Sequence, residues 1–279
     1  MTVSSSLSSA RPDRPLDMHL PTLAILAAVI LWGGSFSAMK TAVSALGVWT
    51  VMWLRLTIAC VLLLPAVKSL LLFTARPGDW KPLLGLVAVQ PCLYFLLEAN
   101  ALKYTTSAQA GVISSSVPLL VTLGAGLFLG EAWSWRSLGG LALAMLGVSG
   151  LTLAGSPDSH APAPLLGNAL ELLAMGCAAG YMLLLKGLSS RYGPWTLTAL
   201  QTLAGVVFFS PGALPLLRGE VAWPEPQVLT ALVFLGAGAS LGAFGLYNWG
   251  MSRIRAGQAA AFINHCGLIP RSSLRLLLV

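Results

Sequence analysis

The feature that most constrains this chain is a series of apolar runs, each about as long as the helix that a lipid bilayer requires. A helix needs about 20 predominantly apolar residues to cross the hydrocarbon core. Strands of a transmembrane barrel would alternate polar and apolar residues, and these runs are continuous. We therefore predict an all-α polytopic membrane protein with eight firm crossings and a partial ninth. The runs lie near 20–39, 48–67, 83–102, 108–129, 137–155, 164–185, 195–217, 228–251 and, for the partial crossing, 257–270.

The composition excludes a water-soluble protein. Only 9% of the residues are charged and 56% are hydrophobic, whereas an ordinary soluble domain has about 25% charged residues. The net charge is +7, but Lys and Arg stand singly between apolar runs, which argues against nucleic acid as a partner and favours the lipid bilayer. The four Cys residues are scattered and no metal-ligand spacing occurs, so we expect neither a metal nor another cofactor.

The distribution of positive charge predicts the orientation. Residues 1–18 are polar and precede a run long enough to span, so we interpret them as a cytoplasmic tail rather than a cleaved signal peptide. With the N-terminus inside, ten Lys and Arg residues fall on the cytoplasmic side and three, Lys40, Lys103 and Arg218, on the other. Cytoplasmic loops retain positive charge. We expect a multi-pass protein of the inner, or plasma, membrane with its N-terminus in the cytoplasm.

The chain also contains an internal repeat. An offset of 146 residues pairs Lys40 with Lys186, and an offset of 149 pairs Gln109 with Gln258. Each repeat is five helices long, and five is odd, so the second copy enters the membrane from the opposite side. The pattern predicts two inverted five-helix repeats. Because the matched positions are few, chance similarity between apolar segments is the alternative.

The second repeat is incomplete. The repeats occupy 20–155 and 164–279, and about 28 fewer residues follow Pro270 than follow its counterpart, Pro118, in the first copy. The tail PRSSLRLLLV also contains two Arg where the first copy reads PLLVTLGAGL. We therefore expect a truncated or frameshifted product that lacks most of helix 9 and all of helix 10. Such a chain would be poorly active unless it forms a homodimer, and a non-functional remnant is an alternative function.

Several motifs resemble a known family. They are LWGGSF in the first run, WLRL in the second, AQAGVISSSVPLL leading to FLGE in the fourth, and AGQAAAFIN near the end. Together they resemble the drug/metabolite transporter superfamily, specifically its EamA-type ten-helix carriers. The resemblance implies an inner-membrane secondary transporter, not an enzyme, that exports small metabolites such as amino acids, related compounds or drugs. No P-loop occurs, so protons, another coupling ion or simple exchange would supply the energy. The structural signature residues would be Gln109, Pro118, Glu131 and Gln258.

Three ionisable residues lie inside apolar runs. A charge inside hydrocarbon costs several kcal/mol, about 3 on insertion scales, so each needs a partner, a hydrated cavity or a position at a helix end. Arg55 is either a structural residue that holds backbone carbonyls or part of the transport path. Glu98 either snorkels to the outer surface or accepts a proton or a cationic group of the substrate, and the same alternatives apply to Glu171.

Aromatic, hydroxyl and amide side chains near the middle of helices would line a path for a polar organic substrate. The alternative is that the aromatic residues anchor the protein at the head-group level. Three consecutive serines precede Pro118, which predicts a helix break beside a cavity. The candidates are Trp32, Ser35, Tyr94, Asn100, Tyr181, Tyr247 and Asn248.

A rival class is a membrane-embedded enzyme. Gly238, Ser240 and Gly242 fit the pattern GxSxG, and His265 follows 25 residues after the serine. The same glycines have the GxxxG spacing that allows close contact between membrane helices. We favour packing, and a serine hydrolase would require turnover that disappears in Ser240→Ala.

Overall fold

The computed structural model describes residues 16–66, 74–129, 161–220 and 224–253, and only isolated positions within 130–160. Every element in these ranges is helical, with η1 and η3 as 3-10 helices and η2 and η4 as π-helices. The elements are α1 (Leu16–Leu46), α2 (Val48–Leu62), η1 (Leu64–Ala66), α4 (Trp80–Val87), η2 (Ala88–Leu93), α5 (Tyr94–Tyr104), α6 (Ser107–Ser114), α7 (Val117–Leu129), α9 (Pro164–Ser189), α10 (Pro194–Phe208), η3 (Ser210–Ala213), α11 (Leu214–Leu217), α12 (Pro226–Val233), η4 (Phe234–Ala243) and α13 (Phe244–Met251).

Five helical segments are long and apolar enough to cross a membrane, which confirms five of the predicted crossings. The five segments are Leu20–Leu46, Trp80–Tyr104, Ser107–Phe128, Pro164–Ser189 and Pro226–Met251.

Two other predicted crossings differ from single full-length helices. In the run 48–67, α2 has only 15 residues and ends at Leu62, and the 3-10 helix η1, which contains Pro65, follows after Leu63. The run 195–217 forms α10 followed by η3 and α11, with a bend of 60° at Phe209. The predicted crossings 137–155 and 257–270 lie outside the continuously described ranges, so the count of eight remains a prediction.

The long crossings are broken where special residues interrupt the helical hydrogen bonds. In Trp80–Tyr104 the break is at η2, where Gln90 has φ −138° and ψ 114° and Pro91 follows, since proline lacks an N–H and its ring clashes with the preceding turn. In Ser107–Phe128, α6 ends at Ser114 and α7 begins at Val117, which confirms the helix break predicted at the serine run.

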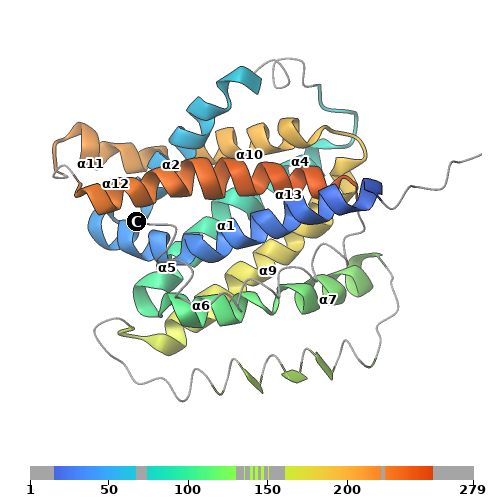
Figure 1. Cartoon of the computed structure of the whole chain (residues 1–279), viewed down its shortest axis with the longest axis horizontal. Helices are drawn as coiled ribbons and strands as arrows, with labels where there is room; N and C mark the ends of the chain where they lie inside the picture. The colour runs from blue at the N-terminus through green and yellow to red at the C-terminus, as the bar shows by residue number, and fades with distance from the viewer. Residues whose placement is uncertain are drawn as a thin grey trace, which may run out of the picture.

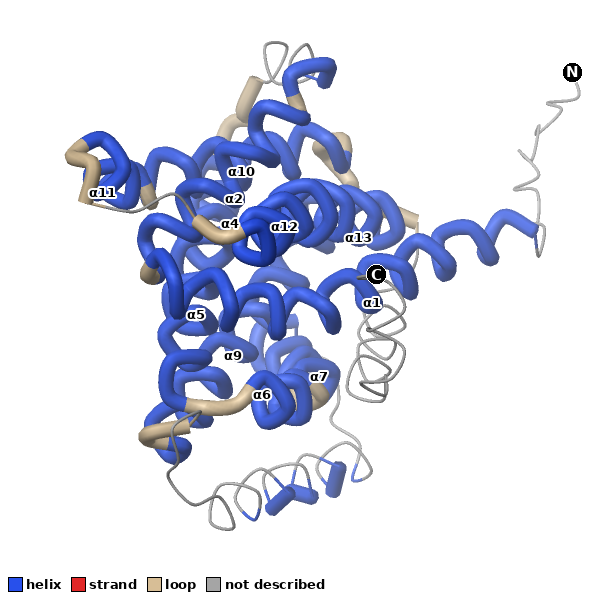
Figure 2. The backbone as a smooth tube through the Cα atoms, turned by 60° about the vertical axis from the view of Figure 1, so that its left-hand side comes forward, coloured by secondary structure: helices blue, strands red, loops and turns tan. Residues whose placement is uncertain are grey.

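The helices bury a hydrophobic core that contains a group of polar side chains, and they present apolar side chains on the outside. In Figure 1, α12 and α13 run as one long rod beside α1, and Figure 2 shows α6 and α7 next to α9, with α2 and α10 together at the other end of the molecule. Large apolar side chains such as Leu23, Leu173 and Val207 are exposed. The buried polar side chains include Arg55, Glu98, Glu171, Asn168, Gln201 and Asn248. This arrangement is the one that lipid, rather than water, stabilises.

Small residues bring the helices close together. A Cβ at Gly236 in η4 would lie 2.7 Å from Cβ of Ile58 on α2, a separation that real side chains do not reach. A Cβ at Gly242 would be 3.7 Å from Leu31 on α1, so this glycine also lies at a helix contact. The glycine-rich segment therefore packs against α1 and α2, as the GxxxG spacing predicted.

Candidate functional site

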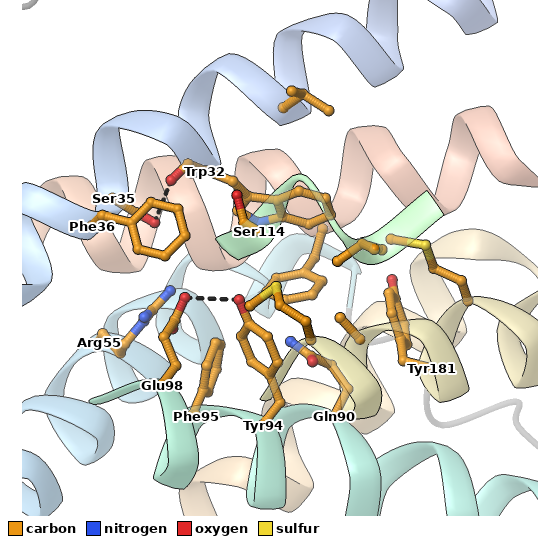
Figure 3. Close-up of a pocket in the computed structure, with 16 residues that line it drawn as sticks. Trp32, Ser35, Phe36, Arg55, Gln90, Tyr94, Phe95, Glu98, Ser114 and Tyr181 are labelled. Carbon is orange, nitrogen blue, oxygen red and sulfur yellow. Dashed lines mark hydrogen bonds between the residues drawn. The ribbon is translucent and has the colours of Figure 1, made fainter. Parts of the chain in front are cut away.

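A cavity lies where helices from both halves of the chain meet, near the middle of the membrane-spanning segments. About 620 Å³ of space, which includes the opening to solvent, is not filled by protein atoms. Figure 3 shows the side chains that line it. Six of the ten residues predicted for the substrate path or coupling line it: Trp32, Ser35, Arg55, Tyr94, Glu98 and Tyr181. The other lining residues are Val29, Phe36, Gln90, Phe95, Ser114, Val117, Met175, Ala178, Met182 and Phe244.

Arg55 reaches the cavity from α2. Its side chain is 2% exposed, Nε donates a hydrogen bond of 2.8 Å to Oγ of Ser240, and the guanidinium carbon lies 4.3 Å above the ring centroid of Phe95. Nη1 also donates a long bond of 4.0 Å to Sδ of Met39. A guanidinium has five N–H donors, so these two bonds leave donors for the cavity. The two interpretations of Arg55 are therefore compatible, because the same group binds η4 and faces the cavity.

Glu98 reaches the cavity from α5 and is 4% exposed. The expectation that Glu98 snorkels to the outer surface is wrong, because the carboxylate points inward, where it accepts a hydrogen bond of 2.7 Å from the hydroxyl of Tyr94 one helical turn earlier (Figure 3).

The charges of Arg55 and Glu98 attract each other but do not form an ion pair within 4.0 Å. In the described ranges, ion pairs join Arg191 to Asp79 and Arg218 to Glu220. The guanidinium of Arg55 and the carboxyl group of Glu98 thus face the same cavity, and each has hydrogen-bonding capacity that the protein does not use. A ligand with one negative and one positive group could occupy both.

Aromatic side chains form the apolar wall of the cavity. The ring centroid of Phe244 lies 5.2 Å from that of Trp32, 6.0 Å from Phe95 and 6.1 Å from Tyr181. These separations are typical of edge-to-face packing. Anchoring at the membrane interface, the alternative for these aromatics, is wrong for Tyr181, because its side chain is 2% exposed and lies at the centre of the bundle.

A second polar cluster lies behind Tyr181 and explains two predicted residues that do not line the cavity. The hydroxyl of Tyr181 donates to Oδ1 of Asn248 at 2.6 Å, and Nδ2 of Asn248 donates to Oγ1 of Thr198 at 2.7 Å and to Oε1 of Gln201 at 3.3 Å. Tyr247 is fully buried, with its ring centroid 5.0 Å from Trp32. Asn248 and Tyr247 therefore support the cavity wall from behind.

The remaining two predicted pathway residues also lie off the cavity. Asn100 donates from Nδ2 to the backbone oxygen of Leu96 at 2.7 Å, a bond within its own helix. Glu171 is 0% exposed, and neither carboxylate oxygen has a hydrogen-bond partner in the described structure. Neither residue lines the cavity, and their place in the substrate path or in coupling stays a prediction.

Sequence reasoning missed the amide of Gln90 as a cavity residue. Gln90 is 2% exposed, and its backbone oxygen accepts a hydrogen bond of 3.2 Å from Nε2 of Gln201. The signal that could have found it is a glutamine directly before a proline in the middle of an apolar run, because such a pair predicts a helix break lined by a polar group.

The structural signature residues are only partly described. Oε1 of Gln109 is 2.5 Å from Oγ1 of Thr105, and its backbone N–H donates to Oγ1 of Thr106, which caps α6. Pro118 lies in the first turn of α7. Glu131 and Gln258 fall outside the described residues, and so does His265, the second member of the hypothetical hydrolase pair. Ser240, its first member, accepts the hydrogen bond from Arg55.

Comparison with known proteins agrees with this architecture. The model of the EamA-like transporter family matches residues 20–153 and 165–267. The uncharacterized transporter YcxC of Bacillus subtilis is 29% identical over 90% of this chain and 83% of its own length. A crystal structure with 20% identity superposes with a TM-score of 0.64 over 92% of this chain and 87% of that one.

Two further relatives have names that state substrates. A protein of Streptantibioticus cattleyicolor named "probable terminal-alkyne amino-acid exporter" is 27% identical over 85% of this chain and 78% of its own length. An S-adenosylmethionine/S-adenosylhomocysteine transporter of Chlamydia trachomatis serovar L2 is 28% identical over 86% of this chain and 75% of its own length.

The chain belongs to the EamA-like transporter family, within the drug/metabolite transporter superfamily. It is a multi-pass membrane transporter of small molecules, not an enzyme.

Proposed function

We propose that this protein is an inner-membrane secondary transporter that exports amino acids or related zwitterionic metabolites. The observation that carries the proposal is the placement of Arg55 and Glu98 on one cavity without an ion pair between them. A guanidinium recognises a carboxylate, and a carboxylate accepts hydrogen bonds from an ammonium group. The aromatic wall with Trp32 and Phe244 would then hold the apolar remainder of the substrate.

Energetics favour a substrate with both charges. Each buried charge costs several kcal/mol unless it is compensated. The bonds from Arg55 to Ser240 and to the sulfur of Met39, and the bond from Tyr94 to Glu98, compensate the two groups only in part. An α-carboxylate and an α-ammonium would complete both sets of hydrogen bonds at once. The substrates named for two relatives, an alkyne amino acid and S-adenosylmethionine, share this α-amino-acid group.

Two observations support an inverted-repeat carrier with alternating access. The family model matches the chain twice, over ranges close to the predicted repeats. In addition, Nζ of Lys40 donates to the backbone oxygen of Thr105 at 2.5 Å, and Nζ of Lys186 donates to that of Met251 at 3.1 Å. Lys186 follows Lys40 by 146 residues, and Met251 follows Thr105 by the same number. The same hydrogen bond therefore occurs at the C-terminal end of α5 and of α13. Rocking of such halves about a central site, with the N-terminus in the cytoplasm, would move the substrate.

Counterflow in liposomes tests the substrate class. Liposomes that contain the purified protein and unlabelled phenylalanine should accumulate labelled phenylalanine, and unlabelled phenethylamine or 3-phenylpropionate should compete poorly, since each lacks one of the two charges. Glu220→Gln is the control, because Glu220 lies on the exposed surface with its side chain 57% accessible. Equal competition by either singly charged analogue would contradict the proposal. Absence of flux for every amino acid tested would favour the alternative of a non-functional remnant.

A further inference from the structure

Glu171 is a buried carboxyl group that the proposed substrate site does not use. It lies on α9, is 0% exposed, and makes no hydrogen bond through either oxygen in the described structure. An isolated carboxylate in such surroundings would cost far more than a neutral carboxyl group, so burial of this kind selects the protonated form. At this position, therefore, a bound proton neutralises the carboxylate of Glu171, because no hydrogen-bonding residue stabilises its charge.

A second carboxyl group lies within electrostatic reach. The charge of Glu98 on α5 acts on Glu171, and the charge of Glu171 acts on Tyr94, which agrees with the extensive packing between α5 and α9. Two neighbouring carboxylates in a dry interior do not both ionise. Glu98 has the hydroxyl of Tyr94 and the attraction of Arg55 to stabilise its anion, whereas Glu171 has neither.

We propose that Glu171 and Glu98 form a proton-binding site, with the proton on Glu171 in this conformation and with Tyr94 and Glu98 connecting it to the cavity. The proposal rests on the proposed transport function and names its coupling ion. Nothing in the family comparison or in the names of the relatives assigns such a site.

The other elements packed against α9 do not supply a competing charge. α6 and α7 carry no titratable side chain. Those carried by α4, η2, α13 and the far end of α5 show no electrostatic interaction with Glu171; they are Lys81, Cys92, Tyr247, Lys103 and Tyr104.

The site would couple transport to protons through hydration. In the described conformation Glu171 is dry and protonated. A conformation that separates α5 from α9 would admit water, and the carboxyl group would then transfer its proton to that water and remain as a carboxylate. The bound substrate would compensate the carboxylate until the carrier opens to the outer side, where the carboxylate takes up a proton as the substrate leaves, and the protonated carrier then returns. One proton would therefore move for each transport cycle, opposite to the exported substrate.

Infrared spectroscopy of the protein in liposomes tests the proton directly and needs no substrate. At neutral pH the wild type should show the C=O stretching band of a protonated carboxyl group, and Glu171→Gln should lack it. Glu220→Gln should keep the band, because Glu220 is exposed, and Glu98→Gln should keep it too. A wild type without the band, or a Glu171→Gln protein that retains it, would overturn the proposal.

A transport experiment distinguishes coupling to protons from transport of the substrate itself. In liposomes with an imposed pH gradient, wild type should accumulate phenylalanine, and Glu171→Gln should lose this accumulation while it keeps counterflow of the same amino acid. Counterflow by wild type without any response to the pH gradient would overturn the proton site and leave the proposed function intact. Accumulation driven by a sodium gradient would overturn it as well. Loss of all flux in wild type would instead refute the proposed function.

Discussion

Two buried clusters in this protein have related geometry and opposite chemistry. On α2 and α5, Arg55 and Glu98 face the cavity, with the hydroxyl of Tyr94 bound to Glu98. On α10 and α13, Gln201 and Asn248 share a hydrogen bond, with the hydroxyl of Tyr181 bound to Asn248. Gln201 follows Arg55 by 146 residues, the offset that relates the two lysines, and Asn248 follows Glu98 by 150.

The two clusters differ in how many of their hydrogen-bonding groups have a partner within the protein. The amides are neutral, and Asn248 bonds to Tyr181, Thr198 and Gln201. Arg55 makes one short hydrogen bond to Ser240 and a long one to the sulfur of Met39, and Glu98 accepts one hydrogen bond from Tyr94. A fully satisfied neutral cluster stabilises a fold, whereas a partly satisfied charged cluster is suited to bind a ligand. The contrast supports the proposal that the neutral cluster stabilises the fold and that the charged cluster binds the substrate.

The largest expected effect comes from making the charged cluster a copy of the neutral one. In the double variant Arg55→Gln, Glu98→Asn, amino-acid counterflow should fall by about 100-fold or more, because loss of a hydrogen-bonded buried charge contact costs about 2–5 kcal/mol. The protein should still fold, since the neutral amides cost less to bury. Initial counterflow rates and elution as a single species in size-exclusion chromatography would measure this, and a double variant with normal flux would show that the two clusters do not differ in role.

The second effect tests the neutral cluster. Asn248→Ala removes the partner of the hydroxyls of Tyr181 and Thr198, so the free energy of unfolding should fall by about 1–3 kcal/mol. Thermal unfolding in detergent measures this, and counterflow below the melting temperature should change less than in the charged-cluster variant. Asn100→Ala is the matched control, because its amide bonds only within its own helix. Equal destabilisation by the two variants would show that the cluster has no special role.

A third effect of similar or smaller size concerns the helix contact behind Arg55. In Gly236→Ala, the new Cβ would lie 2.7 Å from Cβ of Ile58, so η4 and α2 must separate at a cost of about 1–3 kcal/mol. Gly187→Ala is the control, because its added methyl group would have no atom within 4 Å and alanine favours helix. The melting temperature should decrease only for Gly236→Ala, and an unchanged value would refute the close contact.

The smallest effect sharpens the relation between the halves. Lys40→Met and Lys186→Met each remove a hydrogen bond to a backbone oxygen at the end of α5 or α13. Each should reduce stability by about 1 kcal/mol, and the two reductions should be similar if the halves are equivalent repeats. Chemical unfolding of wild type and of both variants measures the two losses of stability. A large loss in one variant and none in the other would contradict the equivalence of the two halves.

Much of the fold and part of the site could be predicted from the sequence. Continuous apolar runs identify membrane helices, because each must satisfy its own backbone in lipid. Arg55 and Glu98 could be selected because a charge inside an apolar run is rare and costly. Gln90 could not be selected in the same way, because an uncharged amide has a smaller cost and its importance depends on a break at Pro91.

The order of residues alone establishes that this chain is a multi-helix membrane protein and which of its residues are costly to bury. Those properties depend on the free energy of transfer of each segment and side chain into lipid, which is local. Which of the polar residues meet is a property of the folded molecule. Folding placed Arg55 beside Ser240, 185 positions away, left Arg55 and Glu98 unpaired across one cavity, and buried Glu171 without a hydrogen-bond partner, because contacts between helices depend on packing that no local pattern encodes.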